Sequence, residues 1–213
     1  MKRLFVSITV VLVAVLTSNA QYFVAGSVGM DFSSGKYKSG GTSTDKPSTF
    51  MFEIWPAMGY FLNDNFAIGL EAGIERSVRN YKNDSKRKVF NTTLGLGILG
   101  IYKLVEVNDL AFILKGSLGY QSSKEKYKTG STSNEDDPTN GIGFFVLPVL
   151  SYSLTERFSV EAYCDFLRFG FYRESQKSGN RKDIDNYFGF GVNYGDSEVF
   201  NNSLLSVGIV YKF

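Results

Sequence analysis

Histidine is absent from the 213 residues of this chain, and that absence excludes several kinds of catalytic site. Without histidine there is no Ser–His dyad, no histidine-ligated metal and no imidazole to act as a general base. The single cysteine, Cys164, cannot form an intramolecular disulfide, and it is better explained as a small apolar filler than as a nucleophile. We therefore expect no enzyme activity, no metal site and no cofactor.

Long hydrophobic runs are also lacking after the first twenty residues, so we expect no membrane-spanning helix. The N-terminus itself has the order of a secretory signal peptide: Lys2 and Arg3, an apolar run over 4–16, and small residues ending at Ala20. We expect cleavage after Ala20, which makes 1–20 a signal peptide and 21–213 the mature domain. Loss of Lys2 and Arg3 leaves 21 basic residues against 21 acidic ones, so the charge balance does not indicate nucleic-acid binding.

Proline is scarce, with 4 residues, whereas glycine (22), phenylalanine (19) and tyrosine (13) are abundant. Hydrophobicity alternates with a period of two, which predicts strands. In 23–32, for example, Val24, Val28 and Phe32 alternate with small or polar residues such as Ser27 and Asp31. The predicted strands are 23–32, 50–61, 66–75, 88–103, 110–122, 141–154, 158–171 and 203–213.

Two all-β classes fit this pattern, a soluble sandwich and a membrane barrel. The second face of most strands consists of Gly, Ala and Ser with isolated carboxylates, which is too small and too sparse for a solvated surface. A narrow barrel explains it, because lipid contacts the large residues and the small ones fit inside. We predict an all-β fold, an eight-stranded antiparallel up-and-down transmembrane β-barrel.

The connections alternate strictly between short turns and long polar loops, which is typical of outer-membrane barrels with short periplasmic turns. The short ones are 62–65, 105–109 and 155–157, and the long ones are 33–49, 79–87, 123–140 and 172–202. Within the last loop, Tyr187–Tyr194 also alternates; a ninth span would break the parity, so we interpret it as a strand extension or a hairpin. We therefore place the protein in the bacterial outer membrane. We also expect it to be a monomer.

Two stretches resemble a known family. Pro56–Gly69 (PAMGYFLNDNFAIG) and Ser206–Phe213 (SVGIVYKF) are similar to small outer-membrane barrels of the OmpX/OmpA-like, OprF-type β-barrel domain family, in the style of Bacteroidetes. The resemblance implies that the alternating C-terminus, with Ile209, Tyr211 and Phe213, is the signal that the barrel-assembly machinery reads. That machinery and outer-membrane lipid are therefore the expected partners; a partner at the cell surface is not identified.

Charged residues at inward positions are the main candidates for a site inside the barrel. They are Glu53, Glu71, Glu75, Lys115, Glu161 and Asp165. A charge in a narrow lumen must be paired or hydrated. We expect a plug of ion pairs centred on Lys115, with Glu71 and Glu161 at similar heights; the alternative is a polar gate or a path for small solutes. Paired carboxylates also occur in hydrolases, but no substrate cleft is apparent.

A basic cluster in the second long loop is the other candidate site. It comprises Arg76, Arg79, Lys82, Lys86, Arg87 and Lys88. At the outer rim such a cluster could bind lipopolysaccharide phosphates, and a solvated loop explains it equally well.

The sequence therefore supports a structural or surface-interaction protein of the cell envelope whose lumen is closed by internal ion pairs. Crowding of the lumen by Glu53, Trp55, Phe145 and Tyr163 favours this function. The alternative is a narrow channel or conduit for small or hydrophobic solutes.

Overall fold

The computed structural model describes residues 22–81, 87–164, 167–179, 181–190 and 206–213, and antiparallel strands dominate it. The strands are β1 (Tyr22–Ser33), β2 (Lys36–Ser39), β3 (Thr42–Asp45), β4 (Ser48–Asn63), β5 (Phe66–Asn80), β6 (Arg87–Val107), β7 (Leu110–Thr129), β8 (Thr132–Glu135), β9 (Thr139–Ser153), β10 (Phe158–Tyr163), β11 (Phe169–Ser178), β12 (Arg181–Phe190) and β13 (Ser206–Lys212). Among these described residues, no helix is long and apolar enough to cross a membrane. The predicted signal peptide lies outside them.

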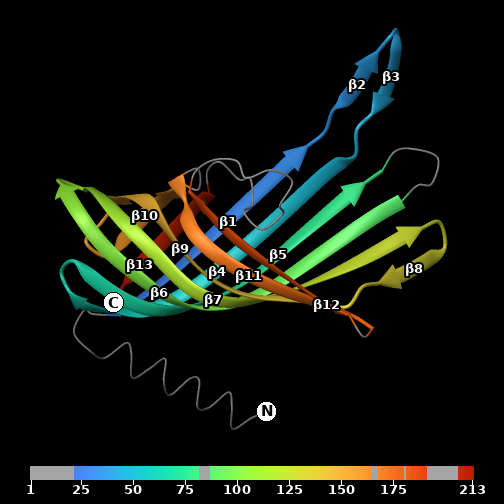
Figure 1. The fold of residues 1–213 in the computed structure, drawn as a ribbon. Helices are drawn as coiled ribbons and strands as arrows, with labels where there is room; N and C mark the ends of the chain where they lie inside the picture. Colours follow the sequence, from blue (N-terminus) through green and yellow to red (C-terminus); the bar gives the residue numbers. More distant parts are fainter. Residues whose placement is uncertain (1–21, 82–86, 165–166, 180, 191–205) are drawn as a thin grey trace, which may run out of the picture.

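Eight strands close into a ring (Figure 1) in the order β1, β4, β5, β6, β7, β9, β10, β13 and back to β1. The first and last strands seal it through pairs such as Val24↔Tyr211 and Val28↔Val207. Closure matters because a strand in a closed ring pairs with a neighbour on both sides, which satisfies backbone groups as a membrane interior requires. The predicted antiparallel barrel is confirmed.

Several strands run further than the sequence pattern predicted, and they do so at one end of the barrel. The predicted long loops contain the hairpin β2–β3, the outer part of β7 with β8, and the hairpin β11–β12. We call this the hairpin end and the opposite one the short-turn end. The stretch from Tyr187 to Phe190 belongs to β12, which pairs with β11, so it forms a hairpin as interpreted; residues 191–194 lie outside the described part.

The predicted strand 158–171 is wrong as a single regular span. Tyr163 in β10 pairs with Val149 of β9, whereas Phe169 in β11 pairs with Val146. From Tyr163 to Phe169 the chain advances six residues, whereas the paired positions on β9 advance only three. Because side chains alternate with a period of two, this odd offset exchanges the two faces, and Tyr172 rather than Arg173 is buried.

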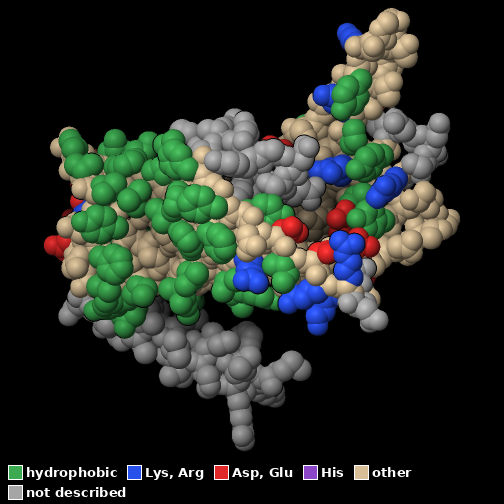
Figure 2. All heavy atoms as spheres, viewed as in Figure 1, with side chains coloured by type: hydrophobic (Ala, Val, Ile, Leu, Met, Phe, Trp, Pro, Cys, Tyr) green, Lys and Arg blue, Asp and Glu red, His purple; other side chains and the backbone are tan. Residues whose placement is uncertain are grey.

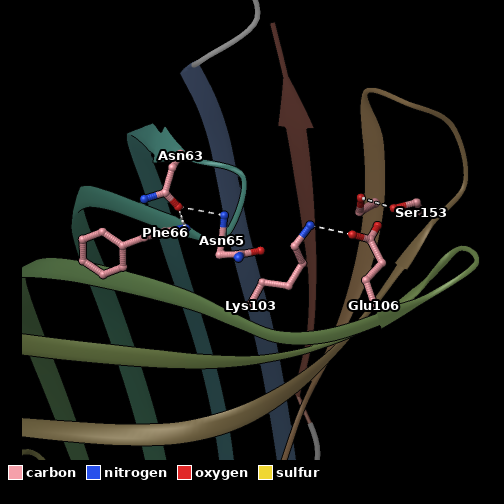
Figure 3. A network of polar contacts seen from close by, with 7 residues as sticks. Asn63, Asn65, Phe66, Lys103, Glu106 and Ser153 are labelled. Carbon is pink, nitrogen blue, oxygen red and sulfur yellow. Dashed lines mark hydrogen bonds and ion pairs between the residues drawn. The ribbon is translucent and has the colours of Figure 1, made fainter.

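At the short-turn end, side chains stabilise the tight connections (Figure 3). Asn63 Oδ1 accepts hydrogen bonds from the backbone N–H groups of Asn65 and Phe66, both at 2.9 Å, which is the local bonding that favours Asn in turns. At the end of β6, just before the next turn, Lys103 donates to Glu106 at 2.5 Å. Asn108 there adopts a φ of 54°, a conformation that Asn tolerates better than most residues.

The two faces of the wall differ in residue size. Large apolar side chains such as Leu70 (63% exposed) and Leu96 (66%) lie on the outside. Hydrophobic side chains cover the wall toward the short-turn end, whereas Lys and Arg gather toward the hairpin end (Figure 2). Their inward neighbours are small residues such as Gly69 and Gly97, or buried ones such as Ala67. This is the arrangement expected when lipid, not water, surrounds the wall.

Candidate functional site

A hydrophobic core fills the barrel lumen toward the short-turn end. It brings together residues from the ends of most ring strands: Phe23, Ala25, Ala67, Leu99, Ile101, Ile113, Leu147, Val149 and Val210. Phe23 and Val149 are 1% and 0% exposed, and Phe61 packs on Phe23 with ring centroids 5.3 Å apart. The lumen is thus packed with side chains at this level, as in other narrow barrels.

A buried ion pair lies in the same region, between β7 and β10. Lys115 Nζ is 2.6 Å from Glu161 Oε2, and their side chains are 6% and 2% exposed. Tyr163 completes the group, because its hydroxyl accepts a hydrogen bond from Lys115 at 2.6 Å and donates one to Glu161 at 2.8 Å. We call these three residues the Lys115 triad. Each charged member has a partner of opposite charge and a shared hydroxyl, which reduces the desolvation penalty of burial.

Glu71 is not part of this triad, although we expected it beside Lys115. Its carboxylate accepts a hydrogen bond from the Ser117 hydroxyl instead. Gly97, directly opposite Glu71 in the ladder, provides the room, since a Cβ there would lie 3.0 Å from both Glu71 and Ser117 oxygens. The cross-strand register, not height along the barrel, therefore decides which carboxylate meets Lys115.

Glu53 and Glu75 are direct cross-strand neighbours on β4 and β5. Glu53 accepts a 3.4 Å hydrogen bond from the Trp55 indole N–H. Asp165, the remaining predicted member of the charge cluster, lies outside the described residues.

A cavity of about 520 Å³ begins at the Lys115 triad and extends to the hairpin end. Its charged lining consists of Glu53, Glu71, Glu75, Lys115, Glu125, Asp136, Asp137, Arg168 and Glu174. Carboxylates outnumber cations seven to two in this lining. Such a cavity can hold water and concentrate small cations.

Sequence reasoning missed Glu125, Asp136, Asp137 and Glu174 as lumen residues, and it also missed Arg168, which lies just before Phe169, where the offset has exchanged the two faces. The sequence pattern assigns 123–140 and 172–202 to loops, but β7 and β11 continue through the first part of each. For β7 the sequence did contain a signal of this continuation, because Gln121, Ser123 and Glu125 extend the inward alternation beyond Ser122.

The Trp55 ring lies in a slot formed by two glycines. A Cβ added to Gly73 would overlap the ring, and one added to Gly95 would lie 2.5 Å from it. We expect Gly95→Ala to displace the ring and to cost about 1–3 kcal/mol of stability. Because Trp55 is the only tryptophan, its fluorescence emission should shift.

Gly100→Ala is the matched control, since it lies in the same strand and its nearest contact would be 3.9 Å. Equal emission spectra for both variants and the parent protein would contradict the proposed position of the ring.

The predicted basic cluster does not form one group. Arg76 and Lys88 are exposed at outward positions. Arg79 lies on the inward face opposite the buried Val89, and Arg87 stacks on the Tyr127 ring at 4.8 Å. Lys82 and Lys86 lie outside the described residues.

The C-terminal strand presents its alternating residues to the outside. Ile209 and Tyr211 are 52% and 40% exposed, and the Phe213 ring contacts Tyr211 at 5.1 Å. The Phe213 N–H donates to the Tyr22 carbonyl at 3.0 Å, which extends the seam between the first and last strands.

Comparison with known proteins agrees with this architecture. A family model described as "Outer membrane protein beta-barrel domain" matches residues 5–213. No curated protein matches by sequence. Among solved structures, a major outer membrane protein from Thermus thermophilus is similar at 13% identity, with a TM-score of 0.51 and coverage of 92% of this chain and 100% of that one.

Two further structures are similar at lower scores. Ail, the attachment invasion locus protein of Yersinia pestis, has 13% identity, a TM-score of 0.43 and coverage of 92% and 100%. The N-terminal β-barrel domain of Pseudomonas aeruginosa OprF has 11% identity, a TM-score of 0.41 and coverage of 91% and 98%. From the family match and the closed barrel, the chain belongs to the outer membrane protein β-barrel domain family and is a protein of the bacterial outer membrane.

Proposed function

We propose that this protein is a closed barrel that contributes to the integrity of the outer membrane and presents its hairpins for contacts at the cell surface. One observation carries the proposal: the hydrophobic core around Phe23 and Val149, together with the Lys115 triad, fills the lumen toward the short-turn end. A packed lumen of this kind leaves no continuous aqueous path, whereas porins keep one open.

The hairpin end supports the surface role. The β2–β3 hairpin projects well beyond the barrel wall (Figure 1). It is polar and exposed, and Tyr37 on it is 63% exposed with Lys46 over its ring at 4.5 Å. An exposed aromatic ring on a projecting hairpin is a common type of contact residue in protein interfaces.

A narrow conduit is the second candidate, and the cavity of about 520 Å³ favours it. Its excess of carboxylates would select cations over anions. Conduction would still require the hydrophobic core below the cavity to open.

Single-channel recording in planar bilayers separates the two candidates. We expect the parent protein to show no conductance steps. The double variant Phe23→Ala with Val149→Ala truncates the two largest fully buried side chains of the core and should produce cation-selective steps, because the acidic cavity then becomes continuous with the other side.

The matched control is Val24→Ala with Leu150→Ala, which shortens outward neighbours on the same strands. It should remain closed like the parent. Regular cation-selective steps from the parent protein would reject the closed barrel in favour of the conduit.

A further inference from the structure

Five cations gather on the outer face of β5, β6 and β7 toward the hairpin end. The ladder registers place nine outward residues in three rows: Arg76–Thr92–Lys124, Val78–Phe90–Lys126 and Asn80–Lys88–Lys128. Five of the nine are Lys or Arg, and none is acidic. We call Arg76, Lys88, Lys124, Lys126 and Lys128 the cationic face.

The cationic face begins where the apolar outer surface of the same strands ends. The rows directly below it are Ile74–Leu94–Ser122, Ala72–Leu96–Tyr120 and Leu70–Ile98–Leu118. From Thr92 to Tyr102, ten residues at about 3.3 Å each, tilted by about 40°, span roughly 25 Å, the height of an apolar membrane band. Thr92 therefore lies at the border between hydrocarbon and headgroups.

The cations of this face lie so close together that they repel one another when no anion is bound. Lys88 and Lys128 are direct cross-strand partners, and like charges in that position repel. Glu135 of β8 pairs with Lys124 at 2.7 Å and Lys126 at 3.2 Å. These hydrogen bonds, first from Lys124 and then from Lys126, lower the pKa of Glu135. Within the described part of the chain, one carboxylate is set against these five cations, which leaves this face strongly positive.

The face is also confined to one side of the barrel. Continuing the Arg76 row in the other direction leads to Phe52 of β4 and then to Met30 of β1. The next row likewise passes from Val78 to Phe50 and Phe32. Met30 and Phe32 are 72% and 70% exposed, so the same ladder rows are apolar on β4 and β1 and cationic on β5–β7.

We propose that the cationic face binds the phosphate groups of a phosphorylated lipid in the outer leaflet, whose acyl chains lie along the apolar rows below. Arg76 provides a planar fork suited to phosphate oxygens, Lys88 and Lys128 add point charges, and the Thr92 hydroxyl lies between Arg76 and Lys124 in the same row. The position at the border of the apolar band distinguishes this ligand from a soluble anion.

The test uses the folded full-length barrel in neutral detergent, with bound lipid counted by native mass spectrometry. The probes are phosphorylated lipid A and its dephosphorylated form. We expect the parent to retain the phosphorylated lipid at least about tenfold better, given the attraction of each membrane-surface cation for anionic lipid. The variant Arg76→Ser/Lys88→Ser/Lys124→Ser/Lys128→Ser should lose this preference while keeping its heat-modifiable gel migration.

The matched control removes the same number of cations elsewhere, as Lys36→Ser/Lys38→Ser/Lys46→Ser/Arg157→Ser, and it should bind like the parent. Three results would overturn the proposal: equal retention of the dephosphorylated lipid, equal loss in the control variant, or unchanged binding by the face variant. Inorganic phosphate alone provides a further arm. Displacement of the lipid by millimolar phosphate would also overturn it, in favour of a general anion site.

Discussion

Replacing Lys115 with methionine should lower the free energy of unfolding by about 3–5 kcal/mol, the cost of breaking a buried ion pair by removing one partner. The substitution keeps most of the side-chain length but leaves the Glu161 carboxylate, 2% exposed, without its cation. The Tyr163 hydroxyl at 2.8 Å would still donate to it, but a neutral donor does not replace the lost charge. Urea-induced unfolding in lipid vesicles measures the change.

The double variant Lys115→Met with Glu161→Leu separates the loss of a charge partner from the loss of packing. It should recover much of the stability, because no uncompensated charge remains. Tyr163→Phe should be milder than either single charge removal, since the direct ion pair at 2.6 Å persists. Equal stability of Lys115→Met and the parent would show that the triad contributes little.

Conductance should not rise in Lys115→Met. In the proposed closed barrel, the hydrophobic core that includes Phe23 and Val149 remains packed in this variant and should still close the lumen. Conductance steps in the single variant would show that the triad, rather than the core, is the barrier.

Deleting Phe213 should remove most of the protein from the outer membrane. The physical reason is twofold. The Phe213 N–H bonds the Tyr22 carbonyl at the seam where the first and last strands meet, and the aromatic ring extends the outward series of Ile209 and Tyr211. By resemblance to the family, that series is also what the assembly machinery reads.

Phe213→Tyr is the informative control, because it keeps both the backbone donor and an aromatic ring. Its yield in membrane fractions, scored by heat-modifiable migration, should stay close to that of the parent. Normal yield of the deletion variant would reject the C-terminal strand as an assembly signal. Equal losses in both variants would point to the phenylalanine ring itself, not to the end of the strand.

The barrel could be predicted from the sequence because its physical cause is local. Alternation of large and small residues, as in Val28–Gly29–Met30, reports directly which side of a strand contacts lipid. The solvent outside the barrel is apolar, so the pattern is inverted relative to a soluble sandwich, and the composition of the small face reveals this inversion. Strand ends were less predictable, since β7 keeps its alternation but continues as a polar hairpin, and polar composition is also typical of a loop.

The sequence by itself determined that Lys115 and Glu161 would face the lumen, because their parity along the strand is a local property. Only the tertiary structure decided that Lys115 meets Glu161 and Tyr163 while Glu71 bonds Ser117, because partners depend on the register between strands distant in sequence. The same holds for the offset between Tyr163 and Phe169 and for the cationic face, which unites Arg76, Lys88 and Lys128 from three strands. Local alternation specifies a side of the wall, and closure of the ring specifies the neighbours.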